Sequence, residues 1–105
     1  MTSSNKLNYQ NGLIPAVIQD VKTGEVLMLG YMNQEALDKT LTEGFVYFWS
    51  RSKKRLWMKG EVSGNKLQVK KIYIDCDKDA LLILVKRLGK NTCHRGTKTC
   101  FIEEI

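Results

Sequence analysis

The chain carries the stretch PAVIQDVKTGEVLMLGYM at residues 15–32, in which two apolar runs are joined by a short polar segment. The β-branched and aliphatic side chains of residues 15–20 and of residues 26–32 favour strands. Lys22-Thr23-Gly24, which lies between them, is typical of a turn. We therefore expect a β-hairpin here, and a fold in which strands dominate.

One short helix is expected directly after this hairpin. Asn33 is a favourable N-cap residue, and Gly44 is suited to end the helix. Between these two positions Ala36, Leu37 and Leu41 recur at helical spacing. Residues 45–49 are then dense in aromatic and β-branched side chains, which predicts a strand that leads into a basic loop.

Two further strands are expected in the second half of the chain. Apolar residues alternate with polar ones from residue 66, and the alternation changes parity near residues 70–71, as it does across a β-bulge. Residues 80–85 read as a buried strand that closes at Gly89, although their periodicity also permits a helix. The fold class is therefore α+β, a strand-dominated single domain with one or two short helices.

Length and composition limit the class of protein further. A chain of 105 residues supports one core, so we expect one domain at residues 11–105 after a polar, flexible N-terminus at residues 1–10. The first residues lack the apolar centre of a signal peptide, and no apolar run reaches the ~18 residues of a membrane span. We expect a cytoplasmic protein without membrane contact. A net charge of +6 favours an anionic partner.

The first candidate site is Asp75-Cys76-Asp77-Lys78-Asp79. If the preceding strand continues, Asp75, Asp77 and Asp79 share one face and Cys76 points to the other. Carboxylates are hard ligands suited to Mg²⁺, whereas a thiolate suits Zn²⁺. Two different metal sites could then lie back to back. A solvated acidic turn without metal is the alternative.

The second candidate site is the C-terminal segment with Cys93, His94 and Cys100, which together with Cys76 are the only cysteines and the only histidine of the chain. Three thiolates around zinc leave a fourth position for water, which is the arrangement of a catalytic site. Two alternatives stay open: buried unreactive cysteines, and a closed structural zinc site with His94 as fourth ligand.

The third candidate site is a segment in which cations alternate with indoles. Guanidinium and ammonium groups bind phosphate, and an indole face stacks on a purine. The same pattern suits single-stranded RNA, so a zinc-stabilised basic RNA-binding module is an alternative function, and a solvated basic loop is another reading. The residues are Trp49, Arg51, Lys53, Lys54, Arg55, Trp57 and Lys59.

Together these residues resemble the phosphoribosyl-AMP cyclohydrolase family over nearly the whole chain, from Gly12 to Phe101. Several independent motifs occur in the expected order. They are Gly12-Leu13-Ile14-Pro15-Ala16-Val17, Met28-Leu29-Gly30-Tyr31-Met32-Asn33, Phe48-Trp49-Ser50-Arg51-Ser52, Leu56-Trp57, Lys59-Gly60-Glu61, Ser63-Gly64, Asp75-Cys76-Asp77 with Asp79, and Cys93-His94 with Cys100-Phe101.

The resemblance implies an intertwined homodimer with zinc held by Cys76 together with Cys93 and Cys100 of the partner subunit. It also implies Mg²⁺ on Asp75, Asp77 and Asp79. The reaction would be hydrolysis of the N1–C6 bond of the purine in 1-(5-phosphoribosyl)-AMP, a step of histidine biosynthesis, by a zinc-activated water. His94 is the candidate for moving the proton. The candidate substrate contacts are Trp49, Ser50, Arg51, Arg55, Lys59, Glu61 and Ser63.

Three departures from the family pattern affect expected substrate contacts and leave the metal ligands in place. Val62 and Arg95 each stand where Thr is usual, and Thr99 stands where Ser is frequent. In many organisms the domain is fused to the phosphoribosyl-ATP pyrophosphohydrolase of the preceding step, so coupling to that activity is expected. The RNA-binding alternative leaves the three aspartates unexplained.

Overall fold

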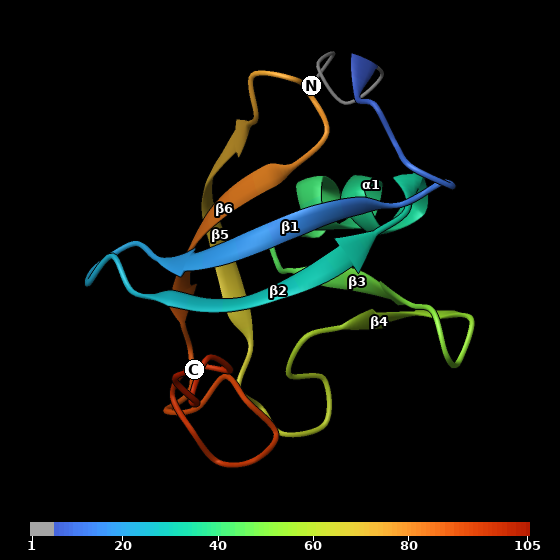
Figure 1. Cartoon of the computed structure of the whole chain (residues 1–105). Helices are drawn as coiled ribbons and strands as arrows, with labels where there is room; N and C mark the ends of the chain where they lie inside the picture. The colour runs from blue at the N-terminus through green and yellow to red at the C-terminus, as the bar shows by residue number, and fades with distance from the viewer. Residues whose placement is uncertain (1–5) are drawn as a thin grey trace.

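The computed structural model describes residues 6–105, which form two sheets and one helix (Figure 1). The larger sheet has the strand order β2-β1-β6-β5, with β1 and β6 parallel and the other neighbours antiparallel. A two-stranded antiparallel sheet, β3-β4, completes the strand-dominated α+β fold that the sequence predicts. The elements are β1 (Ile14–Asp20), β2 (Val26–Met32), α1 (Gln34–Glu43), β3 (Tyr47–Ser50), β4 (Arg55–Met58), β5 (Leu67–Ile74) and β6 (Leu81–Arg87).

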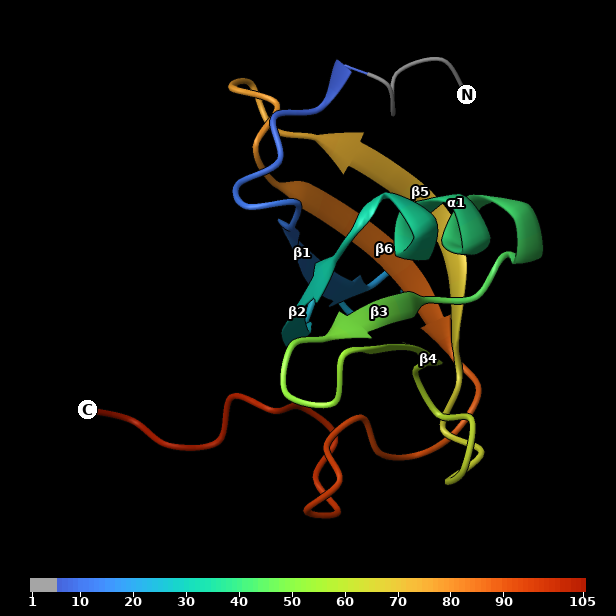
Figure 2. The same ribbon diagram turned by 90° about the vertical axis from the view of Figure 1, so that its right-hand side faces the viewer.

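The predicted hairpin and helix are confirmed. Strands β1 and β2 pair antiparallel around the expected turn. The Asn33 side chain accepts a hydrogen bond from the Ala36 backbone N–H at 2.8 Å, which caps the start of α1. Gly44 ends the helix in the left-handed conformation, with φ at 81°. Helix α1 and the β3–β4 hairpin lie on the same side of the large sheet (Figure 2).

The core lies between this sheet and the helix. Alternate residues of β1 and β6, including Ile18 and Ile83, are fully buried there with Leu37 of α1 and Phe48 of β3. Strand β2 carries Gly30 where β3 approaches, since a Cβ atom at Gly30 would lie 2.5 Å from the Phe48 ring. The glycine therefore sets how closely the hairpin packs on the sheet.

Strand β4 was not expected from the sequence. The segment after Trp49 reads as a basic loop, but residues 55–58 pair with residues 47–50 as β3 and β4. The strand predicted at residues 45–49 is present as β3, but it begins two residues later, at Tyr47, and ends at Ser50. The bulge in β5 near residues 70–71 is confirmed by a register shift against β6 between Val69 and Lys71. The predicted strand at residues 80–85 is confirmed as β6.

The strand before Asp75 does not continue, so residues 75–79 form the acidic turn that was the alternative. Strand β5 ends at Ile74, and the chain then turns back into β6. The Asp75 N–H donates to the Ala80 carbonyl at 2.9 Å, and the Lys78 N–H donates to the Asp75 carbonyl at 2.8 Å. Lys78 has φ at 61°, which no continuing strand permits. The alternation of faces proposed for residues 75–79 is lost for this reason.

The segment before β1 contacts this turn. Residues 1–5 lie outside the described part, so the predicted flexible segment at residues 1–10 is seen only from Lys6. Leu7 is buried, and the Asn8 N–H donates to the Lys78 carbonyl at 2.7 Å. Asn8 also donates through Nδ2 to the Asp77 carbonyl. Within residues 6–105, α1 is neither long nor apolar enough to cross a membrane.

A partly buried ion pair joins the large sheet to the C-terminal segment. Arg87 Nε lies 3.0 Å from Asp20 Oδ2, and Arg87 Nη1 donates to the Lys90 carbonyl at 2.8 Å. Burial acts to raise the pKa of Asp20, but hydrogen bonds from the Lys22 N–H and from Arg87 outweigh it. The pKa of the Asp20 carboxyl is therefore below its ordinary value, and the charged form stabilises the fold.

Replacing Asp20→Asn should lower the free energy of unfolding by about 2 kcal/mol at pH 7, because Arg87 loses its charged partner. Since folding depresses the pKa, this contribution is complete above about pH 4 and disappears as the pH falls through the folded-state pKa. Urea unfolding at pH 7 and at pH 3 measures the difference. Glu35→Gln at an exposed position is the control, and an equal loss in both variants would contradict the prediction.

Candidate functional site

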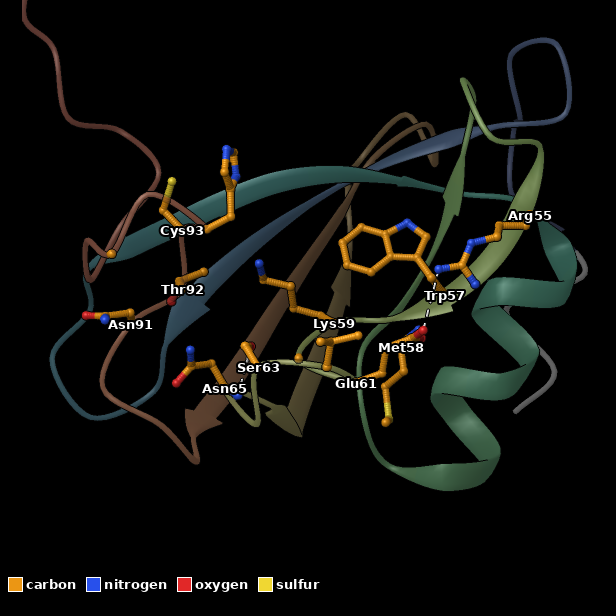
Figure 3. A pocket seen from close by; sticks show the side chains of 14 residues that line it. Arg55, Trp57, Met58, Lys59, Glu61, Ser63, Asn65, Asn91, Thr92 and Cys93 are labelled. Atoms are coloured by element: carbon orange, nitrogen blue, oxygen red, sulfur yellow. Dashed lines mark hydrogen bonds and ion pairs between the residues drawn. The ribbon is translucent and has the colours of Figure 1, made fainter.

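Two pockets lie along the β3–β4 hairpin, and Trp57 lines both of them. The first, which we call the His94 pocket, has a volume of about 300 Å³ (Figure 3). The second, the Arg51 pocket, has a volume of about 620 Å³. The His94 pocket is lined by Arg55, Trp57, Met58, Lys59, Gly60, Glu61, Val62, Ser63, Asn65, Asn91, Thr92, Cys93, His94 and Gly96. The Arg51 pocket is lined by Met28, Leu29, Gly30, Tyr31, Phe48, Trp49, Ser50, Arg51, Ser52 and Trp57.

Strand β4 supplies the polar and aromatic wall of the His94 pocket. Arg55 and Trp57 stand at alternate positions of β4, which places their side chains on one face, and Lys59 directly follows the strand. The Lys59 ammonium group lies 5.9 Å from the centre of the Trp57 ring. Figure 3 shows these three side chains together, with Cys93 across the pocket on the C-terminal segment. The pocket therefore combines cations, an indole and a thiol.

Two predicted substrate residues form hydrogen bonds within the turn that follows β4. Glu61 accepts a hydrogen bond from the Met58 N–H at 2.8 Å, and its other oxygen lies 3.5 Å from Arg55 Nη2. Ser63 Oγ accepts from the Asn65 N–H at 3.2 Å. Glu61 therefore holds both the turn and the Arg55 side chain at the edge of the pocket.

The other predicted substrate residues lie in the Arg51 pocket, not beside His94. Trp49, Ser50 and Arg51 all line it. The Arg51 guanidinium carbon lies 4.3 Å from the centre of the Tyr31 ring, a cation–π contact. Ser50 Oγ accepts from the Lys53 N–H at 3.2 Å, which fixes the turn between β3 and β4. The hairpin thus divides the basic segment between two pockets.

Cys93 and Cys100 are brought together on the C-terminal segment. The Cys100 N–H donates to the Leu27 carbonyl of β2 at 2.7 Å, and the Cys93 N–H donates to the Thr97 carbonyl at 3.1 Å. The two thiols are close enough for the Cys100 thiol to donate to the Cys93 sulfur. His94 is exposed beside them. Two of the three predicted zinc ligands and the predicted proton carrier therefore share one site.

The surroundings shift the pKa values of the two thiols in opposite directions. The Arg95 backbone N–H lowers the pKa of Cys93, assisted by the Thr97 and Cys100 side chains and by the charge on Lys59. Burial raises the pKa of Cys100, and the neighbouring Cys93 sulfur adds to that effect. Cys93 is accordingly the thiol whose ionised form the fold favours.

The turn between β5 and β6 gathers its carboxylates and one thiol. The ligand atoms of Asp75, Cys76 and Asp77 lie within 4.8 Å of one another, so Cys76 is not on an opposite face as predicted. Asp79 completes the group, because its carboxyl is hydrogen-bonded to that of Asp75. This hydrogen bond raises the pKa of Asp79 and lowers that of Asp75. Residues 75–79 therefore form a cluster of oxygen ligands at the surface.

This acidic turn and the cysteine pair lie at opposite ends of the large sheet. Cys76 follows the end of β5, whereas Cys93 follows the end of β6, which runs antiparallel to β5. A strand of eight residues spans about 23 Å. Figure 1 shows the β5–β6 turn near one end of the molecule and the C-terminal segment near the other. One copy of the chain does not assemble all three cysteines.

Several residues of these pockets were missed from the sequence. Tyr31 belongs to a motif that the sequence singled out, but its place in β2 gave no hint of a contact with Arg51. Asn65 and Asn91 carry no short-range signal, since separate segments bring them to the His94 pocket. Thr92 is buried, and its hydroxyl has no hydrogen-bond partner among residues 6–105. Its position next to Cys93 was the one available signal.

Comparison with known proteins agrees with the resemblance found in the sequence. The family model described as phosphoribosyl-AMP cyclohydrolase matches residues 28–102. A phosphoribosyl-AMP cyclohydrolase of Methanosarcina acetivorans is 52% identical over 105 residues, which cover 100% of this chain and 87% of that protein. One of Solibacter usitatus is 55% identical over 95 residues, 90% of this chain and 75% of that protein.

Longer relatives match as well. The histidine biosynthesis bifunctional protein HisIE of Photobacterium profundum is 63% identical over 91 residues, which cover 87% of this chain. The matched region is 44% of that protein, so the chain spans about half the length of the bifunctional relatives.

Proposed function

The chain belongs to the phosphoribosyl-AMP cyclohydrolase family of histidine biosynthesis, and from this premise we propose that it opens the purine of 1-(5-phosphoribosyl)-AMP with a zinc-activated water and with help from Mg²⁺. The observation that carries the proposal is the His94 pocket, whose lining includes a thiol with a lowered pKa, an indole and two cations. A phosphorylated purine needs those groups, and a zinc ion needs the thiolate.

The donor set fits zinc. Cys93 and Cys100 place two sulfur atoms next to each other. Thiolates are soft ligands that commonly bind zinc. With Cys76 as third ligand the site keeps one open position. When bound there, zinc lowers the pKa of a water molecule to ~7 and so supplies a nucleophile at neutral pH.

Cys76 of a second copy of the chain is the proposed third ligand, because β5 separates Cys76 from Cys93 within one copy. The outer face of the large sheet supports such a dimer. Leu29, Val17, Leu82 and Tyr73 are successive cross-strand neighbours on that face. Leu29 is 43% exposed and Tyr73 is 50% exposed, which leaves an apolar row that a second copy would cover.

The acidic turn fits Mg²⁺. Its ligands are carboxylate oxygens, which Mg²⁺ prefers, and they are exposed enough to leave coordination sites for water. The carboxyl of Asp75 lies close enough to that of Asp79 to raise the pKa of Asp79. A divalent cation would offset the repulsion among the three carboxylates. Asp75, Asp77 and Asp79 are therefore the proposed magnesium ligands.

The residues of the chain divide the chemistry between them. Addition of water to C6 and cleavage of the N1–C6 bond require a proton to leave the water and a proton to reach N1. His94, exposed at the pocket beside Cys93, is the proposed carrier for both transfers. Trp57 provides a face for the purine, and Lys59 and Arg55 provide cations for phosphate.

Family membership also bears on the partners and the compartment of the protein. The bifunctional relatives suggest coupling to the pyrophosphohydrolase of the preceding step. The cysteines, which are free in this structure, suit a reducing cytoplasm. A basic RNA-binding module explains the charge of the hairpin, but it gives no role to the three carboxylates or to the thiol pair.

The test is the absorbance change on mixing the protein with 1-(5-phosphoribosyl)-AMP, since ring opening alters the chromophore. We expect turnover that a zinc chelator abolishes. Asp77→Asn should retain its zinc but need at least ~10-fold more Mg²⁺ for half-maximal turnover, because one charged ligand is lost. Asp38→Asn, an exposed carboxylate on α1, is the control. Full turnover in the presence of the chelator would overturn the zinc mechanism.

A further inference from the structure

We propose that the two pockets bind the two phosphoribosyl arms of the substrate separately: the Arg51 pocket takes the adenosine 5′-phosphate half, and the His94 pocket takes the arm on N1. This inference rests on the proposed function.

The indole of Trp57 stands at the boundary between the pockets. It lines both, and it packs against the Phe48 ring with centroids 5.5 Å apart and planes inclined by 45°. Phe48 is fully buried and so supports the indole from behind. A purine stacked on Trp57 therefore has one pocket at either end. The substrate has a matching form, because its purine carries one phosphoribosyl group at N1 and one at N9.

The reacting bond fixes which arm enters which pocket. Cys93 and His94 line the His94 pocket and not the Arg51 pocket, so the N1–C6 bond belongs on that side of Trp57. The arm on N1 is attached to the reacting bond itself and remains there, within reach of Lys59 and Arg55. N9 belongs to the other ring of the purine. Its ribose 5-phosphate consequently extends away from His94 into the Arg51 pocket.

The Arg51 side chain is positioned to bind that phosphate. Its guanidinium lies 4.3 Å from the centre of the Tyr31 ring, which holds the side chain at the pocket. Arg55 and Arg87 are paired with Glu61 and Asp20, whereas no carboxylate between residues 6 and 105 forms an ion pair with Arg51. Ser50 and Ser52 add hydroxyl groups 3.4 Å apart. A guanidinium with free donors and nearby hydroxyls is suited to a phosphate.

AMP tests the assignment, because it carries the N9 arm and lacks the arm on N1. Its binding to the zinc-loaded protein is measured by tryptophan fluorescence. We expect Arg51→Gln to weaken AMP binding about 10-fold or more. Lys59→Gln should spare AMP, because Lys59 lies in the pocket of the arm on N1. Lys53→Gln, in the same hairpin turn and outside both pockets, is the control for lost charge.

Tyr31 is tested as a positioning residue. Tyr31→Phe keeps an aromatic face under Arg51 and should bind AMP as the wild type does, whereas Tyr31→Leu should bind it roughly 3-fold more weakly. With the full substrate, Arg51→Gln should raise KM and leave kcat nearly unchanged, since Arg51 lies away from the reacting bond.

Two results would overturn the assignment: AMP binding that depends on Lys59 instead of Arg51, and no AMP binding to the wild type at millimolar concentration. Neither depends on turnover. Failure of the wild type to convert 1-(5-phosphoribosyl)-AMP would instead overturn the proposed function. The two failures are therefore distinguishable.

Discussion

An equimolar mixture of Cys76→Ala and Cys93→Ala chains, unfolded and refolded together with zinc, should recover about a quarter of the wild-type turnover, although each variant alone is inactive. The reason is the position of the three cysteines. Cys93 and Cys100 are neighbours, and Cys76 lies at the other end of the large sheet. The proposed zinc site therefore combines Cys76 of one chain with Cys93 and Cys100 of another.

The expected fraction follows from random pairing. About half of the dimers contain one chain of each variant, and in such a dimer one of the two sites has all three cysteines. Zinc content should follow the same fraction as turnover. Circular dichroism of each variant shows whether it folds.

The mixture of Cys93→Ala with Cys100→Ala is the matched control. Both of these proposed ligands come from the same chain, so no pairing would restore a complete site, and turnover should stay absent. Recovery in this control, or no recovery in the first mixture despite folded mixed dimers, would contradict a zinc site shared between subunits.

The elements with local signals could be predicted from the sequence alone. The helix begins at an Asn33 cap and ends at Gly44, and both signals lie within a few residues of the structure they specify. The β5 bulge was likewise visible, because it reverses the parity of apolar positions. Strand β4 was missed, because it is short and its residues Arg55 and Trp57 line a pocket, so apolar and polar positions do not alternate clearly along it.

The grouping of site residues could not be predicted, because it depends on how distant segments pair. Arg51 and Arg55 are four residues apart and read as one basic surface, yet the turn between β3 and β4 sends them to different pockets. The turn after Ile74 depends on the pairing of β5 with β6, and the sequence alone left open whether residues 75–79 continue the strand or form an acidic turn. Sequence reasoning proposed the site residues, and the structure shows which of them lie close together.

The second large effect is expected at Gly60, in the turn that carries Glu61 and Ser63 to the His94 pocket. Gly60 has φ at +86°, and its carbonyl accepts a hydrogen bond from the Gly64 N–H at 2.8 Å, which closes the turn. A Cβ atom there would lie 2.4 Å from the Asn65 carbonyl carbon and 2.5 Å from the Lys66 nitrogen. These are backbone atoms, so no side chain can rotate to relieve the contact.

Gly60→Ala should therefore lower the free energy of unfolding by roughly 4 kcal/mol, from left-handed backbone strain and overpacking together. Gly64→Ala is the matched control, because Gly64 has φ at +82° in the same turn with nothing within 4 Å of an added Cβ. It should lose only about 1 kcal/mol, the strain alone. Urea unfolding of both variants separates the two causes. Equal losses would mean that backbone conformation, and not the contact with residues 65–66, makes glycine necessary at position 60.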